Sequence, residues 1–280
     1  MRLGVAIFPT ETTVDVTMLA REVEDRGFES LFVPEHTHIP LREATFPTGA
    51  PVQEHYKRCL DPFVVLGAVA GSTSRLAIGT GVCLVVERDP IITAKEVATV
   101  DLLSGGRFLF GIGGGWNRTE MANHGTDPRT RFALMEERVE AMKVIWTAEE
   151  PEYHGRFVDF DPIWVWPKPL RRPHPPILVG GNGTATLRRV VDYGDEWMPI
   201  AFAADPFAER IVELQRLAEE AGRDPIPVTA SGCRPEARAV ERYAAIGVDR
   251  CTFWLPSAPR DEVMPVLDRY ASLLDQVGTA

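Results

Sequence analysis

The sequence predicts a (β/α)8 (TIM) barrel, and three observations support that prediction. Short apolar runs alternate with segments of helical periodicity, there are eight such pairs, and the chain is 280 residues long. Alternating strands and helices form parallel sheets, and eight such units at this length are typical of a closed barrel. An open, doubly wound sheet is the alternative. No change of composition divides residues 1–280, so we expect one domain.

The expected elements follow from apolar runs, helical periodicity and glycine stops. The first helical pattern ends at Gly27 and a later one at the Gly105-Gly106 pair, as helices commonly do. The expected strands are Leu3–Phe8, Ser30–Glu35, Leu76–Val82, Phe108–Ile112, Ile177–Val179, Trp197–Ala201, Ile226–Ser231 and Cys251–Leu255. The expected helices are Thr13–Arg26, Pro62–Ala70, Ile91–Leu103, Phe132–Trp146, Thr184–Tyr193, Pro206–Ala221, Glu236–Ile246 and Asp261–Gln276.

The segment from Pro151 to Pro176 interrupts this alternation. It is rich in proline and in aromatic residues, which indicates an insertion around residues 151–176 and not a further strand–helix unit. We expect Trp164 and Trp166 to anchor the insertion by packing inside it.

Composition excludes several classes of partner. The net charge is −10 and no long Lys/Arg stripe offsets it, which argues against nucleic acid and anionic membranes. No apolar stretch approaches the ~20 residues that span a bilayer, and the short first run does not resemble a signal peptide. The four cysteines form no CxxC pair, so we expect buried free thiols and a cytoplasmic protein.

Catalytic residues of such barrels lie where the strands end. Here the ends include EHTH (35–38), GTGV (79–82), GIGGGW (111–116), GGNG (180–183) and PIAF (199–202). Glycine allows close backbone approach, so the mouth suits a large flat ligand with a phosphorylated tail. GGNG precedes a helix and can bind an anion, although a plain helix cap is the alternative. Trp116 replaces the third glycine of GxGxxG, which disfavours a Rossmann nucleotide site.

The pair His36 and His38 has the spacing of a metal-binding HxH. A metal-dependent hydrolase needs further histidines and a carboxylate at later strand ends. The fifth to eighth strand ends offer no histidine, so we expect no metal site.

Several motifs together resemble one known family. They are EH after the second strand, RLAIGTGV…RDP, GGRFLFGIGGGW, WPKP…PPILVGGNG and YGDEWMP. In order and spacing, over nearly the whole chain, they resemble the bacterial luciferase-like flavin family, and within it the coenzyme F420-dependent oxidoreductases. The resemblance implies a (β/α)8 barrel, a homodimer, and F420 (a deazaflavin hydride carrier) as cofactor, with FMN in sister branches.

The resemblance also implies site residues. Glu35 and His36 match an acidic residue and a histidine beside the deazaflavin ring. Gly81 and Val82 match a bulge whose non-proline cis peptide supports the back of that ring. The loops that match those packed around the cofactor are Gly113, Gly114 and Gly115, and Gly180, Gly181 and Asn182. Trp116 stands where sugar-phosphate dehydrogenases of the family have glutamate, so that activity is not expected and Trp116 is predicted to wall the substrate side.

The expected function is hydride transfer between F420 and an unidentified small organic substrate. His36 is the candidate for exchanging the accompanying proton, with a purely positional hydrogen bond to the ring as the alternative. Glu35 is expected to orient His36 or the ring, or to cap the chain locally. An FMN-dependent monooxygenase with a separate reductase and a catalytically silent flavin-binding subunit are the alternative functions. The intact Glu35-His36 pair and glycine loops argue against the silent subunit.

Overall fold

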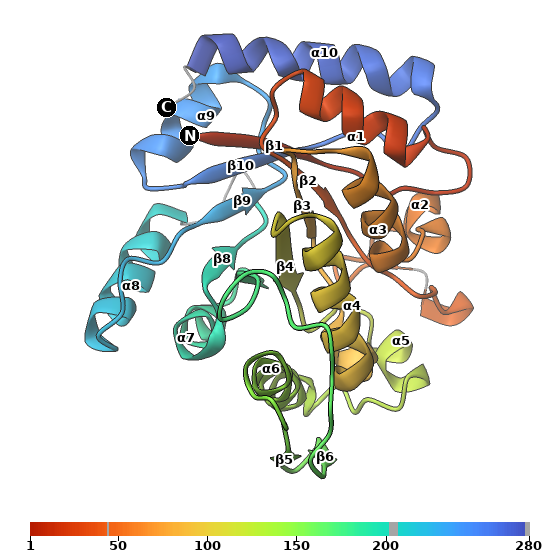
Figure 1. Cartoon of the computed structure of the whole chain (residues 1–280). Coiled ribbons are helices and arrows are strands. Elements are labelled where there is room, and N and C mark those ends of the chain that lie inside the picture. Colours follow the sequence, from red (N-terminus) through yellow and green to blue (C-terminus); the bar gives the residue numbers. More distant parts are fainter. Residues whose placement is uncertain (44, 202–206, 278–280) are drawn as a thin grey trace.

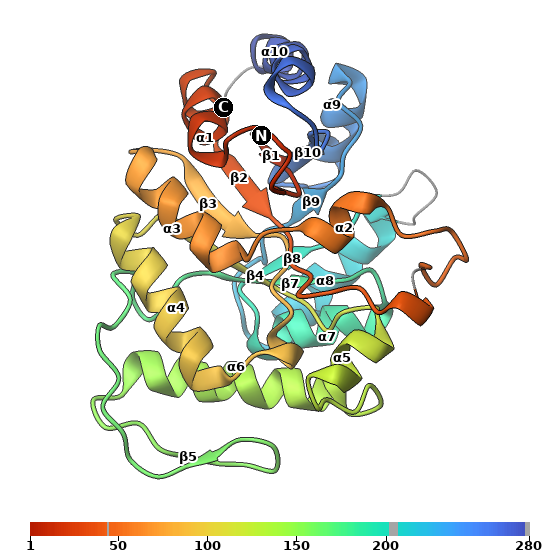
Figure 2. The same cartoon turned by 90° about the vertical axis from the view of Figure 1, so that its right-hand side faces the viewer.

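Eight parallel strands form the barrel that the sequence predicts (Figure 1, Figure 2). The computed structural model describes residues 1–43, 45–201 and 207–277. The barrel strands are β1 (Arg2–Ala6), β2 (Ser30–Val33), β3 (Ala77–Thr80), β4 (Phe108–Ile112), β7 (Ile177–Gly180), β8 (Glu196–Met198), β9 (Thr229–Ser231) and β10 (Arg250–Trp254). Their order is β8-β7-β4-β3-β2-β1-β10-β9. Two parallel bridges, Trp197 with Val228 and Ile200 with Ser231, join β8 to β9 and close the ring.

Helices surround the strands in both views (Figure 1, Figure 2). The large helices are α1 (Val16–Asp25), α3 (Pro62–Ser72), α4 (Pro90–Leu103), α6 (Arg131–Thr147), α7 (Thr184–Tyr193), α8 (Phe207–Glu220), α9 (Ala237–Ala245) and α10 (Arg260–Val277). Asp61 and Asp89 cap α3 and α4, each followed by proline in the first turn. The predicted helix start at Pro206 and the strand-end residue Phe202 lie outside the described residues.

Two short helices were not predicted, and both lie near the carboxyl ends of the strands. They are α2 (Glu54–Arg58) and α5 (Arg118–Asn123), with single 3-10 turns at Leu41–Glu43 and Val85–Glu87. His55 is part of α2.

The barrel interior is filled by side chains from β1, β2, β4, β7 and β8. Ala6, Phe32, Leu109, Leu178 and Met198 form a small buried cluster inside the ring, separate from the larger core between strands and helices. Glycine at position 79 makes room for the largest of them, because a Cβ there would lie 2.6 Å from the Phe32 ring. The strands therefore support the mouth on a packed floor.

The insertion forms a small hairpin outside the barrel. Its strands are β5 (Tyr153–His154) and β6 (Asp159–Phe160), beside α6 (Figure 1). The prediction that Trp164 and Trp166 pack inside it is wrong, because their exposed fractions are 77% and 57%. The chain is extended there, so side chains alternate, and Val165 between them is the buried residue.

The four cysteines are free, and three of them are buried as expected. Cys59 is the exception, since it is only partly buried. Within the described part of the chain, no helix is long and apolar enough to cross a membrane.

Candidate active site

A cavity of about 670 Å³, called here the main cavity, lies where the strands end. Each of the eight barrel strands, or the segment directly after it, contributes at least one lining residue. The structure brings together in its wall every site residue that the sequence predicts, namely Glu35, His36, Gly81, Val82, Gly113, Gly114, Gly115, Trp116, Gly180, Gly181 and Asn182. The volume of the main cavity and its mostly apolar lining are typical of ligand-binding sites.

His36 is held from two sides. Its Nδ1 lies 2.7 Å from Glu120 Oε2, and Trp116 Nε1 donates to its Nε2 over 3.2 Å. Because Trp116 can only donate, Nε2 is the acceptor and Nδ1 carries the proton that Glu120 accepts. The imidazole is therefore fixed in one tautomer, with Nε2 on the side of the cavity wall that Trp116 forms.

The backbone of His36 is fixed as well. The Cys59 thiol donates to His36 O over 3.1 Å and lies 3.2 Å from His36 N. Burial raises the pKa of the Cys59 thiol to about 11, which keeps it protonated and able to donate.

Glu120 is a site residue that the sequence analysis missed. Its side chain is 1% exposed, and Oε1 also accepts from Thr37 N at 3.0 Å. It lies in the first turn of α5, which Asn117 caps through the N–H groups of Thr119 and Glu120. The signal was present as NRTE, a capping residue followed three positions later by glutamate. Here that glutamate reaches the loop after β2.

Glu35 does not orient His36, contrary to one of its expected roles. Its carboxylate accepts from Leu84 N at 2.6 Å and from Arg88 Nε at 2.6 Å. Arg88 also pairs with Asp61 and Glu96, and its contacts with Glu35 and Asp61 raise its pKa despite its burial. Glu35 thus ties the loop after β2 to the segment after β3, which corresponds to the local-capping alternative.

The opposite wall is made of backbone. The peptide bond between Gly81 and Val82 is cis, as predicted. Val82 packs so closely on the neighbouring glycines that a Cβ on Gly113 would lie 2.7 Å, and one on Gly180 3.0 Å, from its methyl groups. The Asn182 amide exchanges two hydrogen bonds with the backbone of Ile200 and fixes the loop after β7.

Arginines gather next to this backbone wall. Arg189 lies 3.6 Å above the Phe132 ring and Arg131 4.4 Å from its centre. Burial lowers the pKa of Arg131, and repulsion from Arg118 and Arg189 lowers it further. The buried Nε of Arg131 has no hydrogen-bond partner among the described residues. Helix α7 begins beside them, directly after Gly183. Because glycine has no side chain, this capping position makes no side-chain hydrogen bond to the first N–H groups of the helix. Positive charge and free N–H groups suit an anion here.

A second acidic group lies behind Glu120. Burial, with repulsion from Glu120 and Glu35, raises the pKa of Glu87 to about 9, so this carboxyl is neutral at pH 7. Within the described part of the chain, neither of its oxygens has a hydrogen-bond partner, and His124 Nε2 lies 3.8 Å away. Glu87 therefore adds no second negative charge behind His36.

His38 points away from the main cavity. It bonds Thr37 Oγ1 and Asn123 Nδ2, and its ring lies 5.5 Å from that of His124. Among the described residues, no group of three or more histidine, cysteine, aspartate or glutamate side chains could hold a metal ion.

This site and fold place the chain in a known class. The chain belongs to the luciferase-like monooxygenase family, whose pattern matches residues 1–254. It is 39% identical over 280 residues to an uncharacterized protein of Mycobacterium tuberculosis, covering 98% of this chain and 99% of the other. The likeness thus extends over both chains almost completely.

Solved structures of similar fold include both cofactor types. A monooxygenase from Streptomyces bottropensis has a TM-score of 0.80 at 21% identity, over 99% of both chains. An F420-dependent secondary alcohol dehydrogenase bound to an F420-acetone adduct has a TM-score of 0.78 at 17% identity, over 100% of both chains. The oxygenating constituent of an FMN-containing diketocamphane monooxygenase from Pseudomonas putida has a TM-score of 0.68 at 18% identity, over 88% of this chain and 72% of the other. The fold is shared, and the chain is of an oxidoreductase family.

Proposed function

We propose that this protein transfers a hydride between coenzyme F420 and a small organic substrate. The observation that carries the proposal is the buried His36 between Glu120 and Trp116, at the edge of an apolar cavity. An acid–base group fixed by two side chains beside a backbone-lined space fits a reaction in which a proton accompanies a hydride. When bound, the cofactor would supply the hydride chemistry, and the protein would orient the reactants.

The residues present fit a flat ring with an anionic tail. The glycines around Val82 leave space that side chains would fill, which suits a ring packed against backbone. The start of α7, Arg131 and Arg189 would hold the tail. FMN has one phosphate, whereas the tail of F420 carries carboxylates as well, and a cluster of arginines supports the more anionic of the two.

The role of His36 follows from its partners. Nε2 faces the reacting side and would pass a proton to, or take one from, the substrate atom next to the carbon that exchanges the hydride. Glu120 would stabilise the imidazolium formed when both nitrogens are protonated, as a buried carboxylate does for other catalytic histidines. The direction of transfer depends on the substrate.

The first experiment is a titration of the pure protein with F420 and, separately, with FMN, followed by absorbance and fluorescence. We expect micromolar binding of F420 and none of FMN. Arg189→Met should weaken F420 binding about tenfold, the scale of a charge-assisted hydrogen bond. Arg188→Met, the neighbouring exposed position, is the matched control and should leave it unchanged. Binding of FMN alone would favour the monooxygenase with a separate reductase.

We also propose that two copies of the chain pair. Family resemblance motivates this, and α3 and α4, which lie side by side, expose the apolar side chains Val64 (75%), Ile92 (60%) and Leu103 (59%). Light scattering at micromolar concentration should give the mass of two chains, and Ile92→Glu should give the mass of one. Val212→Glu, on the exposed face of α8, is the control. A single-chain mass for the unmodified protein would refute the proposal.

A further inference from the structure

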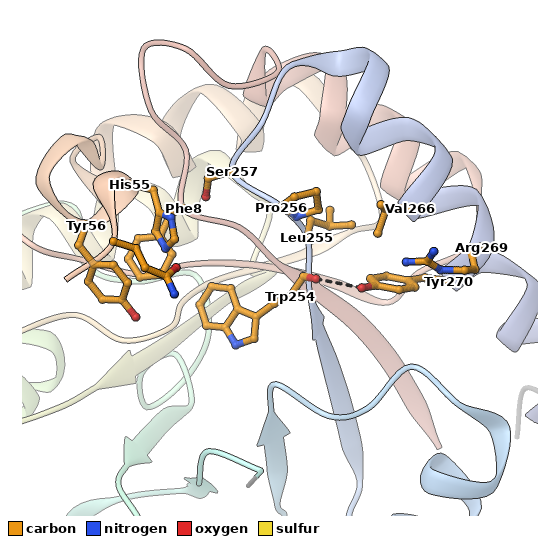
Figure 3. Close-up of a pocket in the computed structure, with 11 residues that line it drawn as sticks. Phe8, His55, Tyr56, Trp254, Leu255, Pro256, Ser257, Val266, Arg269 and Tyr270 are labelled. Atoms are coloured by element: carbon orange, nitrogen blue, oxygen red, sulfur yellow. Dashed lines mark hydrogen bonds between the residues drawn. The ribbon is translucent and has the colours of Figure 1, made fainter. Parts of the chain in front are cut away.

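A second cavity, called here the side cavity, lies beside the main one. It measures about 540 Å³ and is bounded by the ends of β1 and β10, by α2 and by α10 (Figure 3). Tyr270 on α10 donates to Trp254 O over 3.2 Å, the one hydrogen bond that Figure 3 marks among the residues drawn. The rest of the wall consists of apolar and polar side chains, among them Arg269, which lies 5.5 Å from the centre of the Tyr270 ring.

Three aromatic rings belong to both cavities. Phe8, Tyr56 and Trp254 line the main cavity on one side and the side cavity on the other. Phe8 stacks on Trp254 with ring centres 5.3 Å apart, and lies 4.4 Å from the Tyr56 ring. Tyr56 in turn lies 5.3 Å from the ring of His36. A molecule that reacts beside His36 therefore has the side cavity directly beyond these rings.

The side cavity lies across the barrel from the arginine cluster. In the ring order β7, β4, β3, β2, β1, the strand before α7 and the first strand are four positions apart in a ring of eight. A cofactor whose tail follows α7 and Arg189 would thus leave the β1–β10 side to the substrate. This step rests on the proposed function.

The chemistry of the side cavity is simple. Its polar side chains, Gln53, His55, Ser257 and Arg269, make no hydrogen bond or ion pair with any other described residue. None of the described residues that line it is an aspartate or glutamate, although the chain has a net charge of −10. Burial lowers the pKa of His55, so this ring is neutral at pH 7. Arg269, at the exposed rim, is then the only charged side chain among the described lining residues.

We propose that the side cavity binds the remote end of the substrate, and that this end is an apolar or aromatic body carrying a carboxylate. The stacked rings, Leu255 and Val266 would cover the apolar body. Arg269 would pair with the carboxylate, for which its guanidinium offers two parallel donors. The substrate of this protein is accordingly an elongated organic acid that reacts at the end distant from its acid group.

Phenylbutyrate and the neutral phenylbutanol test this directly by calorimetry on the full-length protein, with and without F420. The wild type should bind the acid about three- to tenfold more tightly than the alcohol, the range for one pair at a partly exposed arginine. Arg269→Met should remove that preference. Arg260→Met, on the same helix but outside the lining, removes the same charge and should keep it.

Location is tested by filling the cavity. Val266→Trp should abolish binding of both compounds, whereas Val212→Trp on the exposed face of α8 should not. Phenylbutyrate should not displace F420, because the two would occupy opposite sides of the mouth.

An unchanged acid preference in Arg269→Met, or competition between phenylbutyrate and F420, would overturn the inference. F420 affinity, measured in the same samples, reports on the proposed function separately. Tight F420 binding without acid preference would leave that function standing and remove only the side-cavity assignment.

Discussion

The two ends of the barrel both contain buried charges, and they use them differently. At the amino ends of the strands, Arg250 donates to Glu29 at 2.8 Å, to Glu196 at 3.0 Å and to Thr229 at 2.6 Å. At the carboxyl ends, His36 pairs with Glu120 and Glu35 pairs with Arg88. In the first network the charges satisfy one another, whereas in the second His36 Nε2 is held only by Trp116 and adjoins the main cavity. Barrels in general separate stability and chemistry between these two faces.

The largest expected effect concerns the network at the carboxyl ends of the strands, where His36 adjoins the main cavity. His36→Ala should lower turnover about 10²–10⁴-fold, the usual contribution of a positioned acid or base. Cofactor binding should weaken less, because backbone supplies most of the expected contacts. Steady-state kinetics on an identified substrate, with F420 titration of the same sample, provides the measurement. An unaffected variant would remove the catalytic role and leave the fold intact.

Breaking the Arg250 network at the amino ends of the strands should change stability instead. Arg250 is 1% exposed, so Arg250→Met leaves Glu196 and part of Glu29 without their partner. We expect a loss of about 3–5 kcal/mol in the free energy of unfolding, as for other broken buried pairs. Urea unfolding measures it. Arg216→Met, which removes an exposed arginine paired with two carboxylates on α8, should leave the midpoint unchanged. Similar urea midpoints for both variants would mean that the Arg250 network does not stabilise the folded state.

Glu120 should act through His36. Glu120→Gln should lower turnover about 10²-fold, the lower end of the range for acid–base groups, because a neutral amide stabilises the imidazolium less well. F420 affinity should not change. The solvent deuterium isotope effect on turnover should rise, because proton transfer would limit the rate more strongly. A loss of turnover without a larger isotope effect would indicate a structural role only.

At the carboxyl ends of the strands, we expect Glu87 to lower the free energy of unfolding. Its pKa is raised from 4.5 to about 9, so between these pH values the folded state holds a proton that the unfolded state has released. The free energy of unfolding therefore falls as pH rises through this window. Glu87→Gln, which resembles the protonated acid, should remove that slope and gain about 2 kcal/mol at pH 7. Urea unfolding at several pH values checks this, with the exposed Glu219→Gln as control; an unchanged slope would contradict it.

The sequence predicts the barrel well because its signals are local. Strand runs, the Asp61 and Asp89 caps and the glycine pairs each act within a few residues. The predicted wall of the main cavity follows from the barrel, since all strand ends meet at one mouth. The cis bond after Gly81 came from family resemblance.

The missed features depend on contacts between distant segments. Glu120 and His36 are 84 positions apart, and no spacing rule relates α5 to the loop after β2. Trp164 and Trp166 were misjudged because burial in an extended segment depends on which face meets the core, and here Val165 does. The side cavity is lined by residues of α2 and α10, which are far apart in the sequence, so no local signal predicts it.

The smallest expected effect concerns His38, which shares the HxH motif with His36. Its ring forms hydrogen bonds with Thr37 Oγ1 and with Asn123 Nδ2 of α5, and it lies outside the lining of the main cavity. His38→Ala should change turnover by less than about tenfold, the scale of one or two weak hydrogen bonds. Added EDTA should affect neither the wild type nor either histidine variant, since the described residues offer no ligand set for a metal. Equal large losses for His36→Ala and His38→Ala, together with sensitivity to EDTA, would make the HxH pair a metal site and overturn the separation between an inner and an outer histidine.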